Sequence, residues 1–204
     1  MTDVFIRYNP KNALRKFLAL AAFERWKLER EAADIRLHVI HPGDASVELV
    51  PEFDLTVCSV NMIPGDNFWT RAKQAAEDRA TSPIYVVADD DQLIIGKNWV
   101  ERGVKVLEAH PEFGLLAAHS VNGEVKETAD GDDQIFTMHS SVGCPYFMRK
   151  GSIRKFPEAE GGNQDTEMCN LLWQKGWKYG FIRGLRFNHL GCEYSTIAPG
   201  HWGA

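Results

Sequence analysis

The amino-acid sequence predicts an α/β fold in which a mostly parallel sheet is covered by helices on both faces. Short apolar segments alternate with longer amphipathic segments along the first part of the chain, and this alternation is typical of strand–helix–strand units with parallel strands. Of the 204 residues, 44% are hydrophobic, which suffices for one sizeable core. No internal repeat divides the sequence. We therefore expect a single domain over residues 1–204.

The elements expected in the first part follow from their composition and from the residues that end them. Asn9-Pro10 ends the first strand, and Pro83 separates the second helix from the next strand, because proline lacks the backbone N–H that both structures use. The helices carry apolar side chains at helical spacing. The expected strands are residues 4–8, 35–40, 55–60, 84–88 and 114–118, and the expected helices are residues 12–31, 67–80 and 98–109.

The second part of the chain has shorter elements. Residues 122–133 are rich in glycine and acidic side chains and predict a loop, as do the polar residues 158–164. The expected strands are residues 135–139, 146–149, 179–182 and 185–188, and the expected helix is residues 165–175. The last two strands are close enough in sequence to form a hairpin, so we expect the sheet to continue with mixed strand direction.

Charge and cysteine usage exclude several classes of function. The formal net charge is -5, with no long basic run, which excludes nucleic acid as the main partner. No apolar stretch approaches the roughly 20 residues that cross a bilayer, and the N-terminus lacks the pattern of a signal peptide. The four cysteines are widely spaced and predict reduced thiols in a cytoplasmic protein. These cysteines are Cys58, Cys144, Cys169 and Cys192.

Three adjacent carboxylates, Asp89, Asp90 and Asp91, follow the apolar strand at residues 84–88. In an open α/β sheet, ligands bind at the carboxyl ends of the strands. Crowded carboxylates repel one another by about a few kcal/mol, and a divalent cation such as Mg²⁺ or Mn²⁺ offsets this repulsion. In an extended segment Asp89 and Asp91 point to one side, so both face one ion, or one binds a ribose and the other the metal. The alternative is a solvated acidic turn.

Asp165 begins the helix expected at residues 165–175, after a glycine-rich loop. One interpretation is structural, because an aspartate is a good N-cap or first-turn residue and Glu167 complements the helix dipole. The other is chemical, because a carboxylate at this position can accept a proton from a hydroxyl as a general base.

Both carboxylate clusters, in this order, resemble the GT-A glycosyltransferases, especially the inverting type of family 2. The resemblance covers nearly the whole chain and is carried by YNPKNALRKFLAL, by NFWTRAKQAAEDRATSPIYVVADDDQLI, by SSVGCPYFMRKGSIRKFP, by QDTEMCNLLWQKGWKYGFI and by RFNHLG. The chain departs from the family pattern at three places. Gln164 replaces a Glu before the catalytic Asp, Lys73-Gln74 replaces an Arg-Asn pair, and the Asp after the second strand has only Asp44 as a candidate. These departures leave the nucleotide open.

The resemblance implies a Rossmann-like nucleotide-diphospho-sugar transferase fold, with residues 1–120 as the nucleotide-sugar-binding half and residues 121–204 as the acceptor and catalytic half. It implies a metal-dependent, inverting transfer of a sugar from a nucleoside-diphosphate-sugar to a hydroxyl of a glycan or similar acceptor. Asp165 would be the base, and Asp91 would hold Mn²⁺ or Mg²⁺ with His189 as a further ligand. Asp89 would bind the metal or the ribose, with support from Asp90.

The same resemblance implies roles for further residues. Tyr8 and Asn9 would flank the nucleotide, Arg71 or Lys73 would reach the diphosphate, and Gly143 would let the backbone approach the donor sugar. For His189 the alternative is a half-buried strand histidine, and for Arg71 and Lys73 it is a solvated helix face. His201 is a spare metal ligand. Aromatic candidates for stacking on sugar rings are Trp202, Tyr194 and Trp173, and for Trp173 core packing is the expected role.

Two other functions compete with this interpretation. A sugar nucleotidyltransferase usually has a glycine-rich basic loop after the first strand, whereas this chain has YNPKNALRK. A non-catalytic module that binds a nucleotide-sugar or a carbohydrate keeps the fold without the chemistry. Retention of Asp89, Asp91, Asp165 and His189 favours an enzyme over this module.

Overall fold

The computed structural model describes residues 1–9, 13–43, 56–62, 67–120, 133–138, 142–157 and 163–190. Its helices are α1 (Ala13–Ala32), α2 (Phe68–Arg79), α3 (Trp99–Ala109) and α4 (Gln164–Gln174). Its strands are β1 (Thr2–Arg7), β2 (Ile35–Pro42), β3 (Thr56–Val60), β4 (Ile84–Asp89), β5 (Gln92–Ile95), β6 (Phe113–Ser120), β7 (Ile135–Thr137), β8 (Tyr146–Arg149) and β9 (Lys178–His189).

The strands form one mixed sheet in the order β3-β2-β1-β4-β8-β6-β9-β5, and β7 pairs with β9 off this path. The strands β3, β2, β1 and β4 are parallel to their neighbours, as the alternation of short apolar and amphipathic segments predicts. Beyond β4 the direction is mixed, because β8 is antiparallel to both β4 and β6, and β9 is parallel to β6 but antiparallel to β5. The expectation that the sheet continues with mixed strand direction is therefore confirmed.

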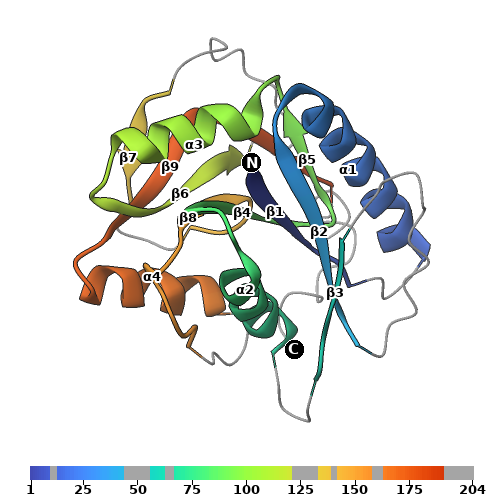
Figure 1. The fold of residues 1–204 in the computed structure, drawn as a ribbon, viewed down its shortest axis with the longest axis horizontal. Coiled ribbons are helices and arrows are strands. Elements are labelled where there is room, and N and C mark those ends of the chain that lie inside the picture. Colours follow the sequence, from blue (N-terminus) through green and yellow to red (C-terminus); the bar gives the residue numbers. More distant parts are fainter. Residues whose placement is uncertain are drawn as a thin grey trace.

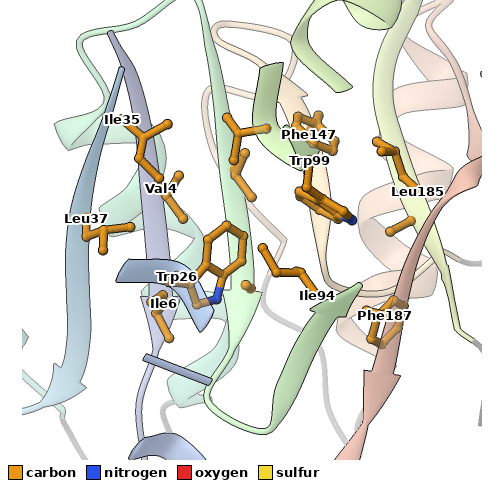
Figure 2. Packing of buried hydrophobic residues seen from close by; sticks show 14 of the residues in the cluster. Val4, Ile6, Trp26, Ile35, Leu37, Ile94, Trp99, Phe147, Leu185 and Phe187 are labelled. Atoms are coloured by element: carbon orange, nitrogen blue, oxygen red, sulfur yellow. The ribbon is translucent and has the colours of Figure 1, made fainter. Parts of the chain in front are cut away.

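Helices cover both faces of the sheet, with α1 and α3 on one face and α2 and α4 on the other (Figure 1). On the first face, Trp26 of α1 meets Trp99 of α3 edge-on, with ring centroids 5.7 Å apart (Figure 2). Trp99 also stacks on Phe147 of β8 at 4.8 Å. Each of these three side chains has no exposed surface, and burial of such rings contributes about 1.5–3 kcal/mol each. This packing fixes the helices relative to the strand ends.

Two expectations about strands were wrong. The expected pair of strands at residues 179–182 and 185–188 is one continuous strand, β9, which changes partners along its length. Its first half pairs with β6 and β7. Beyond a register shift at Ala118/His119, Arg186 and Phe187 pair with both β6 and β5, and the last two residues pair with β5. Residues of β5 were not expected to be a strand, because its partner β9 lies far along the chain and local pattern does not reveal such pairing.

The amino end of β1 carries a buried carboxylate that joins three elements. Asp3 is fully buried and accepts hydrogen bonds from Arg36 Nε at 2.8 Å, His38 Nε2 at 2.9 Å and Thr81 N at 2.7 Å. Burial raises the pKa of the Asp3 carboxyl, but the hydrogen bonds from His38 and from the Thr81 and Ser82 backbone outweigh it, so the pKa lies well below its usual value. Asp3 therefore ties β1, β2 and the connection before β4 together.

We expect Asp3→Asn to lower the free energy of unfolding by about 2 kcal/mol at pH 7, because charge-assisted hydrogen bonds are lost. The pKa of Asp3 is lower in the folded than in the unfolded chain, so its contribution is present above the unfolded pKa of about 4 and is lost as pH falls through the folded pKa. Urea unfolding at pH 7 and at successively lower pH measures both effects. An equal pH dependence in the two proteins would contradict this assignment, and Asp34→Asn, an exposed surface change, is the control.

Candidate active site at the carboxyl ends of the parallel strands

The three adjacent aspartates lie at the carboxyl end of β4, where the sequence places a ligand site. Asp89 is the last residue of β4, and Asp90 and Asp91 form a tight turn into β5. The Asp89 N–H donates to Gln92 Oε1 at 2.8 Å, and Gln92 Nε2 donates to Asp89 Oδ2 at 3.3 Å, which closes the turn. The expectation of an extended segment with Asp89 and Asp91 on one side was wrong, because a turn sends the three carboxylates to different partners.

Asp89 is paired with Arg7, a residue that the sequence did not indicate. Arg7 and Asp89 are direct partners in the parallel β1–β4 register, and Arg7 Nε and one terminal guanidinium nitrogen each lie 2.7 Å from Asp89 Oδ1. Arg7 is only 3% exposed. Its pairing depends on strands far apart in sequence, so the one available signal is a lone charge inside an apolar strand. The carboxylate of Asp89 is thus neutralised by a fixed internal cation.

The Arg7 guanidinium is held on two further sides. Its central carbon lies 4.8 Å from the ring centroid of Trp69 on α2, within the range of a cation–π interaction. It also donates to Cys144 Sγ at 2.9 Å. Burial lowers the pKa of Arg7, but the Asp89 carboxylate raises it, and the pKa lies above its usual value. Burial raises the pKa of the Cys144 thiol, so Cys144 faces this cation as a neutral thiol.

Asp90 has no exposed surface and links the turn to the end of β1. Its Oδ2 accepts the Asn9 N–H at 3.1 Å, and its own N–H donates to the Arg7 carbonyl oxygen at 3.2 Å. Tyr8 is buried with its ring edge-on to Phe23 of α1 at 5.7 Å. Burial, followed by the Asp90 charge, raises the pKa of Tyr8. The structure thus brings Tyr8, Asn9 and Asp90 to one place, and their assignment to a nucleotide stays a prediction.

Asp91 and His189 come together across the β5–β9 ladder. His189 Nε2 lies 3.2 Å from Asp91 Oδ1, and the Leu190 N–H donates to the Asp91 carbonyl oxygen at 2.8 Å. Within the described residues, no group of three or more His, Cys, Asp or Glu side chains is arranged to hold a metal ion. One carboxylate and one imidazole nevertheless fit an ion whose other positions are filled by water and substrate phosphates. Asp89 does not join this pair, because its Oδ1 faces Arg7.

Asp165 lies in the first turn of α4, and Lys73 of α2 donates to its Oδ1. Lys73 is 1% exposed and the Asp165 side chain is 30% exposed, so the alternative of Lys73 on a solvated helix face was wrong. Asp165 is a first-turn residue but not the N-cap, which is Asn163. A Cβ on Gly143 would lie 3.2 Å from Asp165 Oδ2. The structure therefore brings together Asp165, predicted to act on the acceptor, and two residues predicted to contact the donor, Lys73 and Gly143.

The remaining candidates are dispersed. Arg71 is half-buried on α2. Trp173 is 60% exposed, so its expected place in the core was wrong. The side of α4 that faces the sheet carries Met168, Cys169 and Leu172, and Trp173 lies one residue further round the helix. Candidates that lie outside the described residues are Asp44, Tyr194, His201 and Trp202.

Two broader expectations concern the cysteines and membranes. Cys58, Cys144 and Cys169 are buried free thiols, as predicted, while Cys192 lies outside the described residues. In the described part of the chain, no helix has the length and apolar character needed to span a bilayer.

Comparison with known proteins identifies the fold. No protein-family model and no curated protein matches the chain. Among solved structures, S. aureus TarS 1-349 matches at a TM-score of 0.61 and 13% identity, over 95% of this chain and 61% of that one. A longer TarS structure matches at 0.60 and 14% identity, over 92% of this chain and 36% of that one. TarS 1-349 in complex with UDP-GlcNAc matches at 0.57 and 14% identity, over 94% of this chain and 61% of that one.

This chain thus spans less than two thirds of the TarS chains that it matches. TarS is a glycosyltransferase. At this level of identity the comparison concerns architecture alone. The chain therefore has the mixed α/β fold of the TarS glycosyltransferase structures, with a central sheet between two layers of helices.

Proposed function

We propose that this chain is a metal-dependent, inverting glycosyltransferase that moves a sugar from a nucleoside-diphosphate-sugar to an acceptor hydroxyl. The observation that carries the proposal is the Asp91–His189 pair at the carboxyl end of β4, in a fold shared with TarS. TarS structures include complexes with UDP-GlcNAc and with UDP, which supports UDP as the first nucleotide to test. The acceptor is a glycan or a molecule with a similar hydroxyl.

The residues of the site divide into a donor side and an acceptor side. Asp91 and His189 would hold a Mn²⁺ or Mg²⁺ ion, which when bound neutralises charge on the departing diphosphate as a Lewis acid. Tyr8 and Asn9, which follow β1, and Asp90, which accepts the Asn9 N–H from the turn after β4, lie where the nucleoside is expected. Of the two roles open to Asp89, ribose binding fits better than metal binding, because Arg7 already occupies Asp89 Oδ1.

On the acceptor side, Asp165 accepts the proton of the attacking hydroxyl. The hydroxyl oxygen forms the new bond to the anomeric carbon as the bond to the diphosphate breaks. The electron pair of that bond leaves with the diphosphate, and the configuration inverts. The sugar passes through an oxocarbenium-like state, as in glycoside hydrolysis. The exposed part of Asp165 leaves this carboxylate accessible to an acceptor.

Calorimetric titration with UDP, GDP, TDP and CDP, each with Mn²⁺ and with EDTA, tests this function. We expect UDP to bind in Mn²⁺ at least about tenfold more tightly than in EDTA, a difference of about 1.4 kcal/mol. His189→Ala should remove that difference, whereas the control His110→Ala, a surface histidine on the α3–β6 connection, should retain it. Absence of binding by all four nucleotides would contradict the proposed function.

A further inference from the structure

Lys73 is a buried lysine, and burying its ammonium group costs free energy. It lies on the side of α2 that packs against the sheet, beside the buried Ala72 and Ala76, and it is 1% exposed. Removing an ammonium group from water costs several kcal/mol unless a partner compensates for it. Its partner is Asp165 Oδ1 on α4, which lies 92 positions further along the chain. The side chain of Lys73 thus connects two helices at the point where α4 begins.

The second oxygen of Asp165 has different surroundings. Asp165 Oδ2 lies 3.2 Å from the position that a Cβ on Gly143 would occupy, a distance tighter than nine in ten Cβ contacts. The segment of Gly143 is fixed close by, because the Val142 N–H donates to Cys169 Sγ on α4 at 3.4 Å. A side chain at position 143 would therefore press on Oδ2. Glycine leaves the space beside this oxygen open.

We propose that Lys73 is the positioning residue of the base: it fixes Oδ1 of Asp165, so that Oδ2 is the oxygen that accepts the acceptor's proton. Gly143 keeps the approach to Oδ2 free. This inference rests on the proposed function and assigns Lys73 to the acceptor side of the site instead of to the diphosphate. Geometry of this kind is effective because a misplacement of about 1 Å can cost on the order of 10² in rate.

The variant Lys73→Met distinguishes a role in positioning Asp165 from a role in binding the diphosphate. We expect the variant to fold, because methionine fills the volume and Asp165 keeps its contact with water. Its affinity for UDP in Mn²⁺, measured by calorimetry, should stay within about threefold of the wild type. The turnover number for UDP release from UDP-GlcNAc, with water or an added glycan as acceptor, should fall by about tenfold to a hundredfold. Lys73→Met/Asp165→Asn should be no slower than Asp165→Asn alone, because both changes remove one function.

Matched controls and a second variant complete the test. Lys105→Met removes an exposed lysine that also pairs with a carboxylate, Glu101, and should leave turnover unchanged. Gly143→Ala should lower turnover without weakening UDP binding, and it keeps the inference testable if Lys73→Met does not fold. Gly43→Ala, where the nearest atom is at an ordinary 3.4 Å, is its control.

Two results would overturn this inference and leave the proposed function intact. A loss of UDP affinity of tenfold or more in Lys73→Met, with wild-type binding intact, would assign Lys73 to the diphosphate. Multiplying losses in the double variant would show that Lys73 and Asp165 act independently. A wild-type protein that neither binds UDP nor releases it from UDP-GlcNAc would overturn the proposed function, and this inference with it.

Discussion

Asp165→Asn is expected to lower the turnover number of sugar transfer by about 10² or more while the affinity for the donor nucleotide stays within a few-fold. The amide has the shape of the carboxylate but cannot take up the proton of the acceptor hydroxyl. Because the loss falls on turnover and not on binding, it marks an interaction made in the transition state. Initial rates of UDP release and calorimetric UDP titration, on the same preparation, measure the two quantities.

The same variant also has a structural consequence that needs its own control. Lys73 keeps its buried ammonium but loses the negative charge of its partner, so the free energy of unfolding should fall by about 1–2 kcal/mol. Asp133→Asn changes another aspartate that pairs with a cation, Arg102 at 2.7 Å, away from the candidate site. It should leave turnover unchanged. Full turnover in a folded Asp165→Asn protein would show that another residue is the base.

Asp91→Ala is expected to abolish the metal-dependent part of nucleotide binding. Asp91 is 1% exposed and lies against His189, the other side chain proposed to hold the metal; within the described residues no third His, Cys, Asp or Glu side chain completes a metal-binding group with them. With one ligand left, the ratio of UDP affinities in Mn²⁺ and in EDTA should fall to about one. Calorimetry in both buffers gives the ratio, and the Mn²⁺ electron paramagnetic resonance signal reports bound ion directly.

Asp34→Ala serves as the control for Asp91→Ala, because Asp34 is an exposed aspartate that pairs with the N-terminal amine. Circular dichroism should show that both variants keep the secondary structure of the wild type. An unchanged affinity ratio in folded Asp91→Ala would remove Asp91 from the metal site. Such a result would leave His189 as a half-buried strand histidine.

Local pattern predicts the parallel part of this fold well. Strand β4 and helices α2 and α3 lie within one or two residues of the expected ranges, because each has a clear apolar period and a polar or proline boundary. The strand β5 is only four residues long and has no boundary signal of its own. It exists because β9 offers a free edge, and such long-range pairing is not encoded in a short window of sequence.

The candidate site divides in the same way. The roles of Asp91, His189 and Asp165 were assigned from motifs in the sequence, and the structure brings Asp91 and His189 together. The cations that pair with the site carboxylates could not be predicted in this way. Arg7 depends on the register of β1 against β4, and Lys73 depends on how α2 and α4 approach each other. Both facts are properties of packing between distant segments, and one sequence contains no direct record of them.

The strand β9 has different pairing partners along its length, and this affects how readily the hydrogen bonds of its middle and of its carboxyl end open. Around Gly180, it is flanked by β6 on one side and β7 on the other, so its amides should exchange with solvent slowly. Arg186 and Phe187 still pair with both β6 and β5, whereas Asn188 and His189 at the end of the strand pair with the four-residue β5, so the amides at this end should exchange faster. The imidazole expected to hold the metal therefore lies at the more readily opened end of the strand. Bound metal and nucleotide would slow hydrogen exchange there more than anywhere else in β9.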